Sequence, residues 1–303
     1  MTLQAARKIP ALAWALFLAT PAMLASNILV ARLAAGWVPP MALTFWRWAF
    51  TALLAGALAA GALRNSCADI RREWSASLLL GSIGMTLCGA AAYLAGEHTT
   101  ALNIGLIYSA SPVLMVVLAR LFLSEALGAS RIAGIVLSLA GIATIVGRGD
   151  FEALARMAFN RGDLWAVAGS IGWGVYSFLL KRIPSRLDVA SRFACLCAGG
   201  ALVAAPFALA EGFSGNVFPF SLAAIALLAL TVVVSSYGGY LAYARLQQIS
   251  GVAFAGLTVY VMPLFAALYG WIFMGEILHD YHLLGAVLVL MGVWLAGRTR
   301  ERG

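Results

Sequence analysis

Charged residues are scarce in this chain. Asp, Glu, Lys and Arg make up 11% of its 303 residues, whereas a soluble domain carries roughly a quarter. Hydrophobic residues make up 63%, and the mean hydropathy is +0.93. A soluble fold of this length cannot hide so much apolar surface, but lipid accepts it on every side. The composition predicts a protein that crosses a membrane several times.

Residues that bind metals or drive catalysis are equally scarce. The four cysteines have neither zinc-like spacing nor an evident disulfide partner. The three histidines, His98, His279 and His282, lie near the ends of apolar runs, and only His98, beside Glu97, is a candidate pH sensor. We expect no metal and no cofactor. An intramembrane enzyme is disfavoured, because it needs a nucleophile and base, or metal ligands, at depth.

Ten apolar runs follow one another along the chain, each near the ~20 residues that a helix needs to cross the hydrocarbon. They lie at about 11–33, 40–62, 76–96, 101–123, 129–147, 163–183, 188–210, 219–244, 252–274 and 281–297. The loops on one side carry 15 Lys and Arg residues against 4 on the other. This bias predicts that both termini face the cytoplasm.

One residue pattern occurs twice at a constant offset of 151. Pro112, Glu125, Gly134 and Gly141 recur as Pro263, Glu276, Gly285 and Gly292. Five spans per copy place the second copy in the opposite orientation, so we predict an all-α fold of ten transmembrane helices in two inverted five-helix repeats. The repeats are residues 1–147 and 163–303, and residues 148–162 form an extracytoplasmic linker. Inverted repeats of this kind build secondary transporters.

These features resemble a known family. The ten spans in two halves, the repeated Pro–Glu–Gly–Gly pattern and the run Phe45-Trp46-Arg47-Trp48 are similar to EamA-type members of the drug/metabolite transporter superfamily. Within it, the chain most resembles the YddG-type exporters of aromatic and other amino acids. The resemblance implies an exporter of the bacterial inner membrane, with a central cavity lined by spans 1, 3, 4, 6, 8 and 9.

Neutral polar and aromatic side chains dominate the centres of these spans. We predict substrate contacts from Met23, Asn27, Thr86, Tyr93, Tyr108, Trp173, Tyr176, Ser177, Tyr237, Tyr240 and Tyr260. Rings would stack on a bulky solute and hydroxyls would orient it. The alternative is that these residues pack helices together or form interfacial belts.

Arg47 and three prolines are the other unusual residues at depth. Arg47 is the one charge well inside a span; it either binds a substrate carboxylate, or it snorkels outward or satisfies carbonyls at a kinked neighbouring helix. Pro21, Pro112 and Pro263 each lie centrally in a span. A mid-helix proline kinks its helix, so each is either a gating hinge or a fixed kink.

Two further patterns predict packing rather than transport. Glu125 and Glu276 each follow a span and precede the next helix, so we expect each carboxylate to cap that next helix. Small residues should allow close helix approach in lipid; they are Gly81, Gly84, Gly89, Gly134, Ser138 and Gly141.

The sequence leaves more than one solute class open. It favours export of neutral amino acids, aromatic ones included, or similar small metabolites, by alternating access. Transport should be facilitative, because no Asp or Glu falls mid-span and proton-coupled carriers usually keep one there. The alternative is a proton-coupled exporter of drugs or quaternary amines, and nucleotide-linked sugars also stay open. Phosphorylated solutes are disfavoured without a Lys/Arg cluster at depth. The expected partners are the bilayer and the solute, not nucleic acid, and a monomer suffices.

Overall fold

The computed structural model describes residues 11–111, 129–150, 160–250, 255 and 258–297. In these ranges the chain is helical and contains no strand. The helices of the first part are α1 (Ala11–Leu33), α2 (Pro40–Leu58), α3 (Ala60–Asn65), α4 (Cys67–Gly81), η1 (Ser82–Leu87), α5 (Cys88–Gly96), α6 (Ala101–Tyr108) and α8 (Ala129–Val146). Those of the second part are α10 (Arg161–Arg182), α11 (Val189–Phe213), α12 (Leu222–Ala229), η2 (Leu230–Gly238), α13 (Gly239–Ser250), α15 (Thr258–Met274) and α16 (Asp280–Gly297).

Five helical stretches are long and apolar enough to cross a membrane: residues 11–33, 40–58, 67–96, 189–213 and 222–250. Shorter apolar helices cover residues 132–145, 261–274 and 280–292. The prediction of ten spans stays a prediction, because these ranges cover only the described part of the chain.

Two of the long stretches share an unusual feature. α4, η1 and α5 run on as one helix, as do α12, η2 and α13, and the η1 and η2 segments are π-helical. η1 ends at Leu87 and η2 at Gly238, which is the same offset of 151 that separates the repeated motifs. A π-helical turn often marks a functional position in a helix. The two halves thus share a local distortion as well as a sequence pattern.

Polar side chains set the starts of several helices. Thr100, Asn160, Asp188 and Ser221 each accept a hydrogen bond from a backbone amide in the first turn of α6, α10, α11 and α12. These are N-caps, which satisfy amide groups that have no partner within the helix. Pro40 begins α2, where its missing N–H costs nothing.

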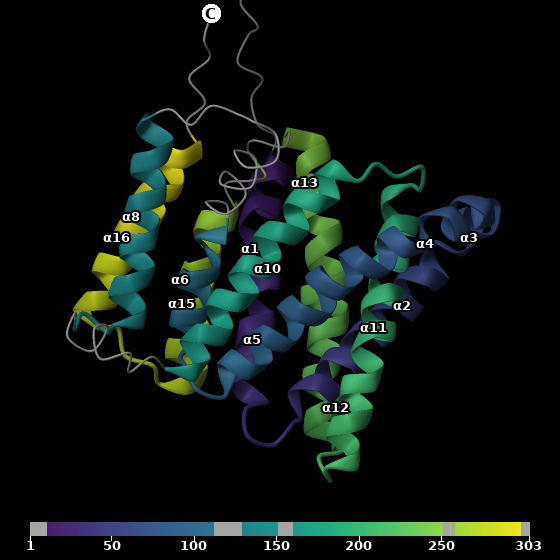
Figure 1. The fold of residues 1–303 in the computed structure, drawn as a ribbon, viewed down its shortest axis with the longest axis horizontal. Coiled ribbons are helices and arrows are strands. Elements are labelled where there is room, and N and C mark those ends of the chain that lie inside the picture. The colour runs from purple at the N-terminus through teal and green to yellow at the C-terminus, as the bar shows by residue number, and fades with distance from the viewer. Residues whose placement is uncertain (1–10, 112–128, 151–159, 251–254, 256–257, 298–303) are drawn as a thin grey trace, which may run out of the picture.

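Glycines allow the helices to approach closely, as the sequence predicted. A β-carbon at Gly81 of α4 would lie 2.5 Å from the backbone nitrogen of Gly200 in α11. One at Gly141 of α8 would lie 2.8 Å from the carbonyl oxygen of Gly285 in α16. In Figure 1, α8 and α16 form a pair at one edge of the molecule, and α2, α4, α11 and α12 lie toward the other. α1, α5, α6, α10 and α15 lie between them (Figure 1).

Two carboxylates of the second half cap helices of the first half. Glu211 of α11 accepts hydrogen bonds from the amides of Met41 and Ala42 at the start of α2, at 3.3 and 2.8 Å. Glu276 accepts from the amides of Ala101 and Leu102 at the start of α6, at 2.9 and 3.4 Å. The expectation that Glu276 caps the next helix, α16, was therefore wrong, because the chain fold brings it to α6 instead. Glu125 lies outside the described residues.

Candidate functional site

Arg47 lies at the centre of a buried polar group. Its side chain, on α2, is 5% exposed. Its Nε donates to Ser236 at 2.8 Å, and its Nη1 donates to Oδ1 of Asn27 at 2.6 Å and to the hydroxyl of Tyr93 at 3.2 Å. The Tyr93 hydroxyl also donates to Asn27, at 2.9 Å. Three residues chosen from the sequence therefore meet, although they come from α1, α2 and α5.

The partners of Arg47 are neutral. Nη2 makes one long contact, 3.5 Å, with Ser235 of η2, and the guanidinium carbon lies 4.3 Å from the ring centre of Trp48. Every acceptor that the structure gives to Arg47 is an uncharged amide or hydroxyl oxygen. A guanidinium has five N–H donors, so Nη2 keeps donor capacity for an anion. Burial of a cation without an anionic partner is costly, and the Nη2 atom of Arg47 can donate to a carboxylate.

Aromatic rings gather beside this polar group. Trp173 of α10 lies 5.4 Å from Tyr176 and 6.5 Å from Tyr240 of α13, measured between ring centres. Tyr240 stacks on Phe193 of α11 at 4.7 Å. The same cluster includes the buried Trp48, the neighbour of Arg47. The structure thus brings together Trp173, Tyr176 and Tyr240, three of the residues predicted to contact substrate, and adds Phe193, which the sequence analysis did not name.

Three other predicted contacts make packing interactions. The buried Thr86 donates to the carbonyl of Gly200 at 2.7 Å. Tyr108 donates to the carbonyl of Cys88 at 3.1 Å. The end of the Met23 side chain lies against Gly238 of η2. These contacts join helices, which agrees with the alternative interpretation given above for such residues.

For the remaining predicted residues, the structure gives their burial or their place in a helix. Ser177 and Tyr237 are half-buried, and Tyr260 lies in α15 with its side chain outside the described set. Pro21 and Pro263 are buried inside the continuous helices α1 and α15, whereas Pro112 lies outside the described residues. One turn of α1 is held from outside, since the Tyr269 hydroxyl donates to the carbonyl of Ala22 at 3.0 Å.

A second buried polar group lies where α6, α10 and α16 begin. Asp163, fully buried, accepts from the hydroxyl of Thr99 and, at 3.1 Å, from the amide nitrogen of Asn103. The Asn103 oxygen lies 3.0 Å from Nε2 of His282, which is 2% exposed. The Asp163 Oδ2 atom is buried without a hydrogen-bond partner. We call Thr99, Asn103, Asp163 and His282 the latch cluster.

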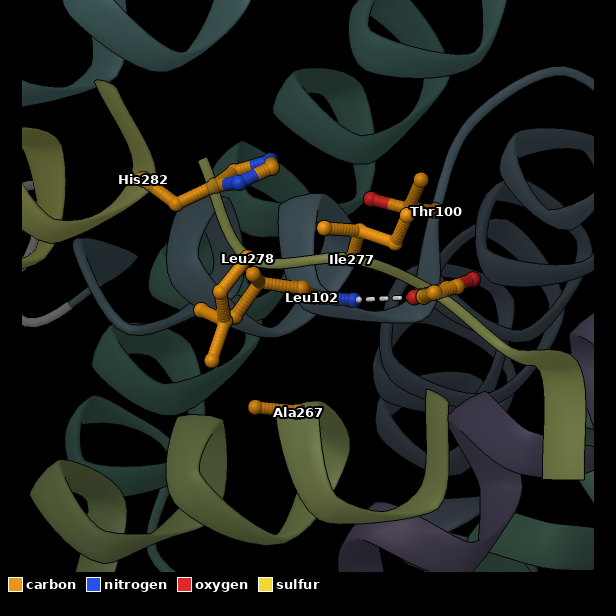
Figure 2. A pocket seen from close by; sticks show the side chains of 7 residues that line it. Thr100, Leu102, Ala267, Ile277, Leu278 and His282 are labelled. Carbon is orange, nitrogen blue, oxygen red and sulfur yellow. Dashed lines mark hydrogen bonds between the residues drawn. The ribbon is translucent and has the colours of Figure 1, made fainter. Parts of the chain in front are cut away.

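A small pocket adjoins the latch cluster. Figure 2 shows it between the start of α6, α15 and the segment before α16, with His282 at its rim. It is lined by Thr100, Leu102, Ala267, Glu276, Ile277, Leu278 and His282. Its volume is near the minimum that holds one water molecule, so no solute binds there in this conformation.

Known proteins resemble this chain over most of its length. A model of the EamA-like transporter family matches residues 11–147 and 160–298. The chain belongs to this family. An uncharacterized transporter of Archaeoglobus fulgidus is 30% identical over 223 residues, which are 74% of this chain and 76% of the relative. A probable terminal-alkyne amino-acid exporter of Streptantibioticus cattleyicolor is 28% identical over 82% of this chain and 83% of that protein.

A solved crystal structure shares the fold of this EamA-like transporter. It has a TM-score of 0.57 and 20% identity, and the match covers 92% of this chain and 96% of the other. Membership of a transporter family implies that the protein is not an enzyme. Within the described residues, no cluster of three or more His, Cys, Asp or Glu side chains offers a metal site.

The sequence analysis of this EamA-like transporter missed the latch cluster. His282 was placed near the end of an apolar run, and neither Asp163 nor Asn103 was named as a site residue. In the structure the side chains of Asp163 and His282 are buried, because the starts of α10 and α16 pack against the corner between α5 and α6. The available signal was that Asn103, Asp163 and His282 are polar residues just inside apolar runs on one expected side of the membrane.

Proposed function

We propose that this EamA-like transporter exports neutral amino acids, with aromatic ones favoured, across the bacterial inner membrane. Two inverted five-helix repeats would alternate in access, with both termini in the cytoplasm, no cofactor, and a monomer as the working unit. The single observation that carries the proposal is the buried Arg47, whose partners are all neutral, beside the rings of Trp173, Tyr176 and Tyr240.

This arrangement suits a zwitterion with an apolar side chain. The substrate carboxylate would supply the anion that Arg47 lacks, through Nη2 and in exchange for the long Ser235 contact. The substrate side chain would stack on the ring cluster, where an aromatic pair contributes about 0.5–1.5 kcal/mol beyond burial. The ammonium group would find the oxygens of Asn27 and the Tyr93 hydroxyl nearby.

The Streptantibioticus relative is a probable terminal-alkyne amino-acid exporter, which supports this substrate class. The competing proposal of a quaternary-amine exporter fits less well, because Arg47 would repel a cation that has no carboxylate. Rings can hold such cations, so the experiment below includes one.

We propose further that transport is facilitative. Within the described residues no Asp or Glu side chain lies at the depth of Arg47, and the buried Asp163 sits in the first turn of α10, at the expected outer end. Proton-coupled carriers usually keep a carboxylate within the membrane-spanning part of a helix. Solute flux is therefore expected to follow the solute gradient alone.

Uptake into proteoliposomes tests both statements. Labelled Phe, Trp, Met and Thr would be offered beside a quaternary ammonium dye and a phosphorylated sugar, with and without an imposed pH gradient. Saturable amino-acid flux without a pH gradient, and no accumulation with one, is the expected result. Flux of the dye alone, or accumulation driven by the pH gradient, would overturn the proposal in favour of a proton-coupled drug exporter.

A further inference from the structure

The latch cluster joins the two halves of the chain at one end of the helices. Thr99 and Asn103 belong to the first half, at the corner between α5 and α6, and Asp163 and His282 belong to the second half, at the starts of α10 and α16. Nearby, Arg32 at the end of α1 donates to Glu276 at 3.2 Å and to the carbonyl of Gly96 at 2.6 Å. Any opening between the halves at this end must break the latch cluster.

The hydrogen bonds of the latch cluster define the protonation of His282. The backbone N–H of His279 points at Nδ1 of His282 at 3.0 Å, so Nδ1 carries no proton and accepts. The Asn103 nitrogen donates to Asp163 and, at 3.1 Å, to Thr99, so the Asn103 oxygen faces His282 as an acceptor. Nε2 of His282 therefore carries the proton and donates. The closed arrangement holds a neutral imidazole with both nitrogens engaged.

Protonation of His282 is incompatible with this arrangement. A second ring proton would sit on Nδ1, directly opposite the His279 N–H, and both groups would be donors. The charge would also be buried, which is costly without an anion in contact. Asn103 stands between the imidazole and Asp163, so the carboxylate does not contact the ring. The imidazolium is stable only when the cluster opens to water.

The other charged and titratable groups around His282 do not compensate for this clash. On its own segment, His279 and Tyr281 lie 5.6 and 4.1 Å from its ring, measured between centres, and Asp280 begins α16. α6 contributes only the neutral Asn103.

Glu276, across the pocket, is paired with Arg32 and caps α6. From α10 comes Asp163, and Arg148, just after α8, acts electrostatically on Asp163.

We propose that the latch cluster is a proton-sensitive gate on the outer side of the transporter, opened when His282 takes up a proton from the external solution. The proposal rests on the transport function and orientation proposed above. The proton binds Nδ1 as the gate opens and returns to the same solution as it closes. No net proton crosses the membrane, so the gate regulates a facilitative exporter without driving it.

The state of the gate can be measured without any substrate. We would place a reporter cysteine at Leu102, beneath His282 in the pocket (Figure 2), in a Cys67→Ser background, since Cys67 is exposed and the other three cysteines are buried. Its labelling by a membrane-impermeant thiol reagent would be divided by that of Ser214→Cys, an exposed position on the same expected side. The ratio cancels the intrinsic pH dependence of the thiol.

Acidification of the outer solution from pH 7.5 to 5.5 should raise the labelling ratio roughly tenfold, because one hydrated histidine titrates near 6.5. Acidification of the inner solution should leave the ratio unchanged. His282→Gln keeps an amide donor for Asn103 but cannot titrate. The labelling ratio measured in this variant should therefore not change with pH. The matched control is His98→Gln, which removes a more exposed histidine, 47% accessible, from the same end and should keep the full response.

A pH response that persists in His282→Gln, or one that follows the inner pH, would overturn the gate. If His282→Gln does not fold, the Leu102→Cys protein that keeps His282 still tests the proposal. A labelling ratio that does not change with the outer pH in that protein contradicts the gate. Failure of the substrate proposal is distinguishable: amino-acid flux would be absent while the labelling response remained.

Discussion

Arg47 donates from Nη1 to Oδ1 of Asn27 at 2.6 Å, so that a charged side chain of α2 is held by a neutral side chain of α1. This pairing leaves the positive charge without a negative partner among the described contacts of Arg47. Under the proposed function, the carboxylate of the substrate supplies that negative partner, so a variant that supplies it from within the protein separates a substrate contact from a structural role of Arg47.

Asn27→Asp tests the charge of Arg47 with almost no change in shape. The new carboxylate would pair with the guanidinium and neutralise it. We expect phenylalanine flux to fall by about tenfold or more, while the melting temperature in detergent stays level or rises. Ser236→Ala is the control, because it removes one neutral acceptor of Arg47 without adding charge. Wild-type flux in Asn27→Asp would show that Arg47 serves packing alone.

Trp173→Ala tests the ring cluster. Loss of the ring should weaken the preference for Trp and Phe over Thr by about 0.5–1.5 kcal/mol, or roughly two- to tenfold, since Thr has no ring to stack. The measurement is competitive uptake of the three amino acids. Trp46→Ala is matched in size, but Trp46 packs with Phe50 and Phe220 in a different cluster, so its preference should equal that of the wild type.

Gly81→Ala tests the contact between α4 and α11. The added methyl would meet backbone atoms of Gly200 and Leu196 at 2.5 and 2.6 Å, which cannot move as a side chain does. Overpacking of this kind costs about 1–3 kcal/mol, and thermal unfolding should report it. Gly61→Ala in α3 has nothing within 4 Å of the new carbon and should be neutral or gain up to about 1 kcal/mol from helix propensity. Equal melting temperatures for the two variants would contradict this packing.

Asp188 links stability to pH at the start of α11. Hydrogen bonds from Ser191, and also from the amide of Ala190, hold the pKa of the Asp188 carboxyl below its usual value. A lowered pKa stabilises the folded state above the unfolded-state pKa, near 3.9, and this stability is lost as the pH falls through the folded pKa.

Asp188→Ala should therefore cost about 1 kcal/mol at pH 7, as N-cap removal does, and less below pH ~4. Thermal unfolding at both pH values measures the difference. Asp188→Asn keeps a cap without a titrating group, so its stability should lack this pH-dependent contribution. A cost of Asp188→Ala that is the same at both pH values would argue against the linkage.

Much of the architecture follows from the composition and from motif spacing in the sequence. Composition alone indicates lipid as the solvent, and the repeated spacing of Pro263, Glu276, Gly285 and Gly292 reveals the duplication. The close approach predicted from Gly81 and Gly141 is present. Such features can be read because each depends on residues near one another in sequence or on the sum of all residues.

The partners of single side chains cannot be read in this way. Glu276 caps α6, 175 residues away, rather than the helix that follows it, and Arg47 finds acceptors 20, 46, 188 and 189 residues distant. Hydropathy locates a residue along the membrane normal, but it does not say which helix lies beside it.

The sequence by itself determined the solvent, the all-helical class and the family resemblance, because hydrophobicity and motif spacing are properties of the chain alone. Only the tertiary structure decided that Asp163 and His282 are buried together through Asn103, although both lie at helix ends. Burial depends on how helix ends pack against one another, and that packing joins residues up to 179 positions apart.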